Sequence, residues 1–146
     1  MRVLGIDFGD RNVGLALSDA LRLTAQPLGT YRLTGRDDDD RAYFKDLVIK
    51  HQVAEIVIGL PLRMNGTAGS RVEKTRGFAK WIEAAVRVPL IFWDERLTTH
   101  QALMVVHEQK VSLKAKKSVI NQISAAIILQ GYLDSKRSDA YVPQDR

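Results

Sequence analysis

The sequence contains no cysteine among its 146 residues, which excludes disulfide bonds, cysteine-ligated zinc and thiol catalysis. It also has no apolar run near the roughly 18 residues that a membrane-spanning helix requires. The opening stretch MRVLGIDFGD has one basic residue and meets an aspartate after a short apolar run, so we expect neither a signal peptide nor a membrane anchor. A cytoplasmic protein with no membrane partner is therefore expected.

Acidic residues are in deficit, with 17 Asp and Glu against 22 Lys and Arg, for a formal net charge of +5. This excess favours an acidic partner such as nucleic acid, although charge alone leaves that question open. Hydrophobic residues make up 45% of the chain, enough for a substantial core. No repeat or linker divides the sequence, so we expect one domain over residues 1–138 and a polar tail over 139–146.

The pattern of apolar residues predicts an α/β fold. Residues 2–8 and 12–18 are apolar strands joined by a short turn, as in a hairpin, and a third strand is expected near 28–33. Further along, strands and helices alternate, with strands predicted at 54–61 and 89–95 and helices at about 42–48, 70–87 and 118–134. Thr98 and Gln101 fit a capping box for one more helix. This order predicts a mixed central sheet flanked by helices.

Carboxylates end two of the predicted strands. Asp7 follows an apolar run between Gly5 and Gly9, where a charge is costly unless it is solvated, used, or caps the turn. Asp94 and Glu95 end a second strand in the same way, and ligands of open α/β sheets gather at the carboxyl ends of strands. Oxygen ligands from two strands suit a hard cation such as Mg²⁺ or Mn²⁺. Because adjacent strand residues point to opposite faces, we expect Glu95, with its longer side chain, to be the ligand and Asp94 to be the reserve.

Other segments have less specific readings. The acidic run RDDDDR at 36–41 is suited to a helix N-terminus, although acid clusters also bind cations. The loop GLPLRMNGTAGS at 59–70 offers backbone N–H groups to a phosphate, yet it lacks the Gly-Lys-Ser/Thr ending of an ATP-binding P-loop. A lysine cluster before the last helix is either a solvated loop or a phosphate contact.

Four segments together resemble the YqgF/RuvX family. They are GIDFGDRNVGLALSD (5–19), EIVIGLPLRMNGT (55–67), WDERLTTHQA (93–102) and VINQISAAIILQGYL (119–133), in order over nearly the whole chain. The first alone is weaker, because similar strands open sugar kinases and actin-like ATPases, which need two such domains. The resemblance implies an RNase H-like fold and a divalent-metal nuclease site. Family members are described as Holliday-junction-resolvase-like and as ribonucleases for the 5′ end of 16S ribosomal RNA precursors, with a link to ribosome maturation.

The resemblance implies three site positions in this chain. Asp7 would bridge two Mg²⁺ or Mn²⁺ ions, Glu95 would hold one of them, and position 121 on the last helix would hold the other. The family pattern has aspartate at that third position, whereas this chain has Asn121. We expect substrate contacts from basic and hydroxyl residues near these segments, namely Arg11, Arg63, Arg96, Thr98, Lys110, Lys114, Lys116 and Lys117.

Asn121 admits four interpretations. The chain is a naturally weakened enzyme, it carries an introduced Asp→Asn change, asparagine suffices as a ligand, or Asn121 is an ordinary polar residue in a first turn capped by Ser118. If residue 121 is a ligand, Ser124, Ala125 and Ile128 share its face and let the helix approach the sheet. On this basis Val119, Ile123, Ile127 and Leu133 are expected to anchor the apolar side.

Three functions follow from these patterns. The first is a metal-dependent nuclease that acts on precursor ribosomal RNA, with ribosomal particles as a further partner. The second is a Holliday junction resolvase acting on branched DNA, which would work as a homodimer because two strands must be cut symmetrically. The third is a nucleic-acid-binding protein with a crippled site, acting in ribosome assembly.

Overall fold

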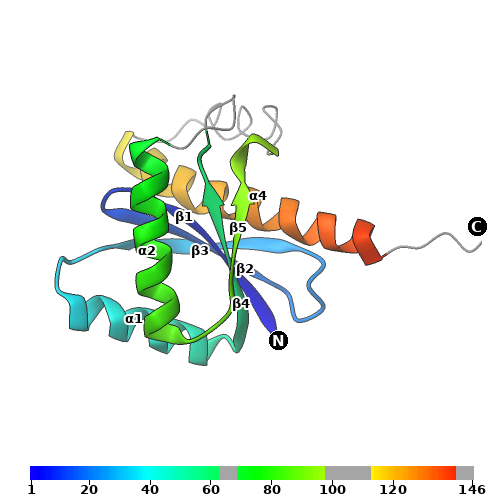
Figure 1. The fold of residues 1–146 in the computed structure, drawn as a ribbon, viewed down its shortest axis with the longest axis horizontal. Coiled ribbons are helices and arrows are strands. Elements are labelled where there is room, and N and C mark those ends of the chain that lie inside the picture. Colours follow the sequence, from blue (N-terminus) through cyan, green and yellow to red (C-terminus); the bar gives the residue numbers. More distant parts are fainter. Residues whose placement is uncertain (63–68, 98–112, 141–146) are drawn as a thin grey trace, which may run out of the picture.

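The computed structural model describes residues 1–62, 69–97 and 113–140, with side chains over 119–137 of the last range. Five strands, three α-helices and one short 3-10 helix lie in these ranges (Figure 1). In chain order they are β1 (Arg2–Phe8), β2 (Asn12–Ser18), β3 (Ala25–Arg32), α1 (Asp37–Lys50), β4 (Val53–Leu60), α2 (Ser70–Val86), β5 (Leu90–Asp94), η1 (Glu95–Leu97) and α4 (Leu113–Ala140).

The strands form one mixed sheet in the order β3-β2-β1-β4-β5. The first three strands are antiparallel neighbours, and β1, β4 and β5 run parallel, as the change from hairpin to alternating strands and helices predicts. Strand β1 is central, so its carboxyl end lies between β2 and β4. Any group placed there is within reach of side chains from both neighbouring strands.

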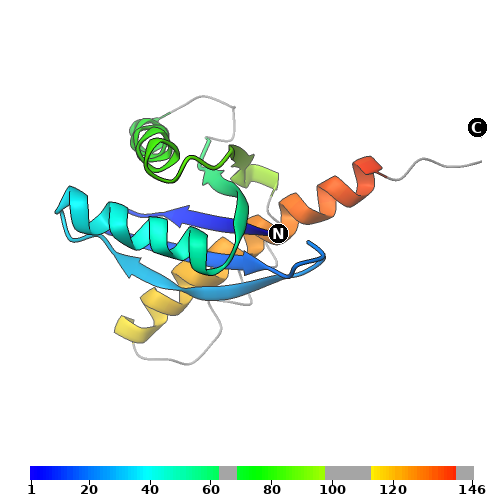
Figure 2. The same ribbon diagram turned by 90° about the horizontal axis from the view of Figure 1, so that it is seen from below.

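Helices cover both faces of the sheet. On one face, Leu4 and Ile6 of β1 pack with Phe44 of α1 and Phe78 of α2 in a core rich in aromatic residues. On the other face, Val3 of β1 packs against α4. Figure 2 shows α4 crossing the sheet on the side opposite α1. The alternation of strand side chains accounts for the two cores, because odd-numbered residues of β1 face α4.

The predicted hairpin strands have the observed bounds, whereas the third strand begins earlier, at Ala25. The last helix was predicted too short: it runs from Leu113 to Ala140, past the expected domain end at residue 138. The sequence LKAKK favours helix and contains no breaker, so Lys114, Lys116 and Lys117 were wrongly predicted to precede the helix. Ser118 is consequently an interior helix residue, and the interpretation of Asn121 as a first-turn residue is wrong.

The apolar side of α4 also differs from the prediction. Val119, Ile123 and Ile127 are only partly buried, whereas Leu133 is buried as expected. The buried positions follow the face of Asn121 instead, where the helix packs on the sheet; they are Ala125, Ile128, Leu129, Tyr132 and Leu133.

Two further predictions fall outside the described residues. The capping box of Thr98 and Gln101 lies in the range 98–112, and most of the glycine-containing loop lies in the range 63–68. Within the parts of the chain that the structure describes, no helix has the length and apolar character to cross a lipid bilayer.

Candidate active site

Asp7 lies near the carboxyl end of the central strand with a glycine on each neighbouring strand. Gly14 of β2 is its partner in the antiparallel register. On the other side Ile6 pairs with Ile58, so Gly59 of β4 follows beside Asp7. Burial raises the pKa of Asp7 from 3.8 to about 6, which the positive charge of Arg71 partly opposes. No described residue donates a hydrogen bond to this carboxylate.

The missing side chain at Gly14 lets α4 contact the sheet directly. A Cβ at this position would lie 2.0 Å from the backbone oxygen of Asn121 and 3.1 Å from its Cβ. Any other residue at position 14 would therefore push α4 away. Since Gly14 is paired with Asp7, this contact holds Asn121 at the level of Asp7 along the sheet. A similar contact lies one turn further along the helix, where a Cβ at Gly5 would lie 3.0 Å from the backbone oxygen of Ala125.

The second glycine, Gly59, makes room for Glu95. A Cβ at Gly59 would lie 3.1 Å from both Cγ and Cδ of Glu95, and 2.5 Å from Cδ1 of Ile128. Burial and, after it, the charge of Asp7 raise the pKa of Glu95 from 4.5 to about 7, although the charge of Arg71 opposes them. Asp7 and Glu95 therefore interact as like charges in a poorly hydrated place. This is the close approach of two carboxylates that the strand ends led us to expect.

Asp94 has a different role. Its carboxylate accepts hydrogen bonds from Arg96, with Nε at 3.0 and 2.9 Å, Nη2 at 2.6 Å, and the backbone N–H at 2.9 Å. Side-chain hydrogen bonds from Arg96 lower the pKa of Asp94, although burial opposes them. Glu95 begins the 3-10 turn η1, so the chain turns after Asp94 and the two acids diverge. The geometry brings Glu95 to Asp7 and leaves Asp94 bound to Arg96.

Arg71 is a site residue that the sequence analysis missed. It lies in the first turn of α2, where it donates to the backbone oxygen of Phe8 at 3.1 Å and to Asp10 at 3.4 Å. Its charge lowers the pKa of both Asp7 and Glu95. The only sequence signal was a basic residue directly after the glycine-containing loop, and nothing local linked that loop to the end of β1.

The structure separates the predicted substrate contacts into three groups. Arg11 is exposed at the turn between β1 and β2, and exposed Arg96 pairs with Asp94. The backbone of three lysines lies in the first turns of α4: Lys114, Lys116 and Lys117. Outside the described residues are Arg63, Thr98 and Lys110.

The donors at this site suit a hard divalent cation. Asp7 and Glu95 supply carboxylate oxygens, and Asn121 supplies a neutral amide oxygen. Where the structure describes the chain, no three His, Cys, Asp or Glu side chains gather as a metal-binding group, so the site reaches at most two formal negative charges from such residues. The donor chemistry therefore fits Mg²⁺ or Mn²⁺, with one charge fewer than the family pattern provides.

Residues 1–135 match the family model of RuvX, described as Holliday junction resolvase. A protein of Halothermothrix orenii, named "Putative pre-16S rRNA nuclease", is 42% identical over 134 residues, covering 92% of this chain and 95% of the relative. A protein of Moorella thermoacetica with the same name is 46% identical over 134 residues, with the same coverage.

Among solved structures, RuvC of T. thermophilus in complex with a Holliday junction substrate superposes with a TM-score of 0.66. The match is 15% identical and covers 98% of this chain and 99% of RuvC. A second T. thermophilus RuvC structure gives a TM-score of 0.56 at 14% identity, covering 93% of this chain and 97% of that one. At this identity the likeness concerns the fold alone, and it confirms the predicted RNase H-like fold with its mixed sheet and flanking helices.

Proposed function

The chain belongs to the RuvX family, and from this premise we propose that it is a metal-dependent nuclease that hydrolyses phosphodiester bonds in RNA. The substrate we propose is the 16S ribosomal RNA precursor, which the names of the relatives contain, and the family resemblance implies cleavage at its 5′ end. The proposal rests mainly on one observation: Asp7 and Glu95 are neighbouring carboxylates beside the helix that bears Asn121.

In this proposal Asp7, Glu95 and Asn121 hold Mg²⁺ or Mn²⁺, which when bound supplies charge stabilisation to the phosphate and activates water. The two carboxylates repel each other, and a cation between them would relieve that repulsion. Arg71 offsets part of their charge. Its guanidinium contacts the last residue of β1, where a substrate phosphate would approach. The glycines fix the spacing of the ligands, so the site is built before a cation binds.

Asn121 weakens this site without removing it. An amide oxygen ligates a hard cation, but it carries no formal charge. We therefore expect cleavage by the chain with Asn121 to need more Mn²⁺ or Mg²⁺ than the Asn121→Asp variant needs. The backbone contact with Gly14 does not involve the side-chain end of residue 121, so this substitution changes charge while keeping the helix in place.

The test is cleavage of a labelled precursor-type RNA and a labelled four-way DNA junction, with Mn²⁺, Mg²⁺ or EDTA. We expect RNA cleavage with the metals and none in EDTA. Asn121→Asp should raise the rate, and Asp7→Ala should lower it on the order of 10³-fold, because several kcal/mol of charge stabilisation depend on the metal. Asp38→Ala, which removes an exposed acid of α1, is the matched control and should leave the rate unchanged.

Cleavage of neither substrate by the chain with Asn121 or by Asn121→Asp would overturn the nuclease proposal and favour a nucleic-acid-binding protein with a crippled site. A second candidate function is resolution of branched DNA, which the description of the matching family model favours. Symmetric cutting of the junction with no RNA cleavage would select it.

A further inference from the structure

Asp10 lies in the turn between β1 and β2 and faces two cations of α2. One carboxylate oxygen of Asp10, Oδ1, lies 3.4 Å from Nη1 of Arg71 and 3.9 Å from Nζ of Lys74. We call these three residues the Asp10 cluster. Their side chains are well exposed, at 68% for Asp10, 50% for Arg71 and 66% for Lys74. Ion contacts of this length in solvent are weak, so the carboxylate is loosely held.

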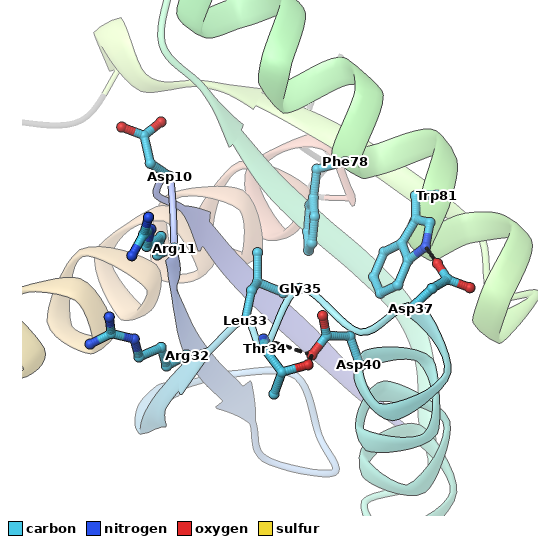
Figure 3. Close-up of a pocket in the computed structure, with 10 residues that line it drawn as sticks. All are labelled: Asp10, Arg11, Arg32, Leu33, Thr34, Gly35, Asp37, Asp40, Phe78 and Trp81. Carbon is cyan, nitrogen blue, oxygen red and sulfur yellow. Dashed lines mark hydrogen bonds between the residues drawn. The ribbon is translucent and has the colours of Figure 1, made fainter.

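Two other acids in the same region are held more firmly. They line, together with Asp10, a cavity of about 760 Å³ (Figure 3). Figure 3 shows that Asp40 accepts from Thr34 and that Asp37 accepts from the indole of Trp81, the latter at 2.7 Å. The carboxylate of Asp10 points away from Trp81 in the same view. Of the three acids, Asp10 is the one that a competing anion displaces most easily.

The two cations of the Asp10 cluster lie next to the candidate active site. Arg71 donates to the last backbone oxygen of β1 at 3.1 Å, and its charge lowers the pKa of both Asp7 and Glu95. Lys74 follows about one turn later in α2 and faces the same oxygen of Asp10. An anion in place of the Asp10 carboxylate would therefore contact both cations and lie beside the two active-site acids.

The surroundings of Lys74 strengthen its attraction for an anion. Asp10 and Lys74 line a second cavity, of about 440 Å³, together with the aromatic rings of Phe8, Phe78 and Trp81. Phe8 and Phe78 stack with ring centroids 4.4 Å apart. Apolar surface beside a charged amine lowers the local dielectric, which increases the Coulomb attraction to a phosphate. The cavity also leaves room beside the cluster for the sugar that carries this phosphate.

We propose that Arg71 and Lys74 bind the phosphate next to the scissile one in the RNA strand, and that Asp10 occupies this place until the phosphate displaces it. The N–H of Gly9 donates to the oxygen of Asn12 at 2.9 Å and holds the turn, so Asp10 leaves by side-chain rotation alone. The inference rests on the proposed nuclease function and deepens it. A free phosphate only replaces one anion by another, whereas a strand adds contacts at the active site. The Asp10 cluster therefore selects strands over mononucleotides.

Binding of RNA without cleavage tests the competition directly. In EDTA, the Asp7→Asn variant is titrated into a fluorescein-labelled single-stranded RNA hexamer, and binding is read as anisotropy. In this background Asp10→Asn should tighten binding about 5-fold, because the phosphate no longer competes with a carboxylate. Asp38→Asn removes an exposed acid of α1 and is the matched control, with an expected change below about 2-fold. Equal affinities for Asp10→Asn and Asp38→Asn would overturn the proposal.

The gain from Asp10→Asn should depend on the cations of the cluster. Lys74→Ala should weaken binding about 5-fold and lower the slope of log Kd against log salt by about 1. Lys80→Ala is its control, because Lys80 lies in the same helix but lines another groove, beside Phe92. In the Lys74→Ala variant the gain from Asp10→Asn should be smaller, since part of the charge for which both anions compete is gone. Additive effects of the two substitutions, or equal losses for Lys74→Ala and Lys80→Ala, would contradict the proposal.

A free mononucleotide provides a further arm of the binding experiment. Adenosine monophosphate at the concentration of the hexamer should leave the anisotropy unchanged. Displacement of the hexamer would show a free-nucleotide site and overturn the assignment to an RNA strand.

Cleavage assays separate this inference from the nuclease proposal. If precursor-type RNA is cleaved in Mn²⁺ but Asp10→Asn binds RNA no more tightly than Asp38→Asn, the phosphate site fails alone. If neither the RNA nor the DNA junction is cleaved but the gain from Asp10→Asn persists and depends on Lys74, the nuclease proposal fails and the phosphate site stands.

Discussion

Asp7 and Asp40 are both largely withdrawn from solvent, yet their surroundings are opposite. Asp40 accepts a hydrogen bond from the Tyr31 hydroxyl at 2.7 Å and two from Thr34, at 3.0 Å from the backbone N–H and 2.9 Å from Oγ1. Burial raises the pKa of Asp40, but these hydrogen bonds outweigh burial and lower it. For Asp7, burial dominates and raises the pKa to about 6.

The difference separates a structural acid from a candidate catalytic one. The charge of Asp40 is satisfied by the protein, which ties β3 to the first turn of α1. The charge of Asp7 is not satisfied by any described hydrogen-bond donor, and this charge makes ionisation of the neighbouring Glu95 harder. A buried acid that the fold does not satisfy is available to an external cation.

The largest expected effect comes from filling the space beside Asp7. Gly14→Ala should lower the free energy of unfolding by about 3 kcal/mol, because the new Cβ overlaps the backbone of Asn121 and the helix cannot yield as a side chain would. Gly77→Ala is the control: its Cβ meets nothing within 4 Å on an exposed helix position and should stabilise by about 0.5–1 kcal/mol. Urea unfolding measures both, and equal stability of the two variants would contradict the close packing.

The next effect tests Asp40 as a structural acid. Asp40→Ala should destabilise the protein by about 2 kcal/mol, because it leaves Tyr31 and Thr34 donors without their acceptor in a buried place. Asp40→Asn should cost less, since all three bonds end on Oδ1, which the amide retains.

The pH dependence of the stability that Asp40 provides follows from the direction of its pKa shift. The folded pKa of Asp40 is lowered, so its stabilisation is present above the unfolded pKa near 4 and is lost as pH falls through the folded pKa. The thermal unfolding temperatures of Asp40→Ala and of the unsubstituted chain should therefore converge in acid. A constant difference at every pH would contradict this role.

The smallest effect tests Asp7 and has the opposite sign. Its folded pKa is raised from 3.8 to about 6, so the metal-free protein should lose stability as pH rises through this window, and Glu95 extends the loss to about pH 7. In EDTA at pH 8, Asp7→Asn should be more stable than the unsubstituted chain by about 1–2 kcal/mol. Lower stability of Asp7→Asn under these conditions would show that the carboxylate has a structural partner.

Local sequence was sufficient for the elements whose signals are local. The bounds of β1 and β2 followed from two apolar runs and a tight turn. The start of α4 was missed because LKAKK has helix propensity but no apolar stripe. Its helical state depends on the packing of later residues of the same helix. Strand alternation predicted that Asp94 and Glu95 would point apart, and the longer side chain favoured Glu95 as the ligand. In the structure the two acids are separated by the turn at η1 instead.

The parts of the site that escaped prediction depend on contacts between distant residues. In the sequence Gly14 has the pattern of an ordinary strand residue. Its role depends on the contact with Asn121 of α4, which lies 107 positions later in the sequence. Arg71 is one of many basic residues until the first turn of α2 is found beside the end of β1. Both contacts join residues that are far apart in the sequence. The periodic spacing of apolar residues, which predicts helices and strands, therefore gives no sign of either contact.

The direct contact of α4 with Gly14 has a further consequence for variation at position 121. Because backbone atoms make this contact, the location of residue 121 does not depend on which side chain it carries. Aspartate and asparagine, which have nearly the same shape, would thus be presented at the same point with a difference of one unit of charge. If the proposed site binds a metal ion, its affinity could change with one codon while the architecture around residue 121 stays constant.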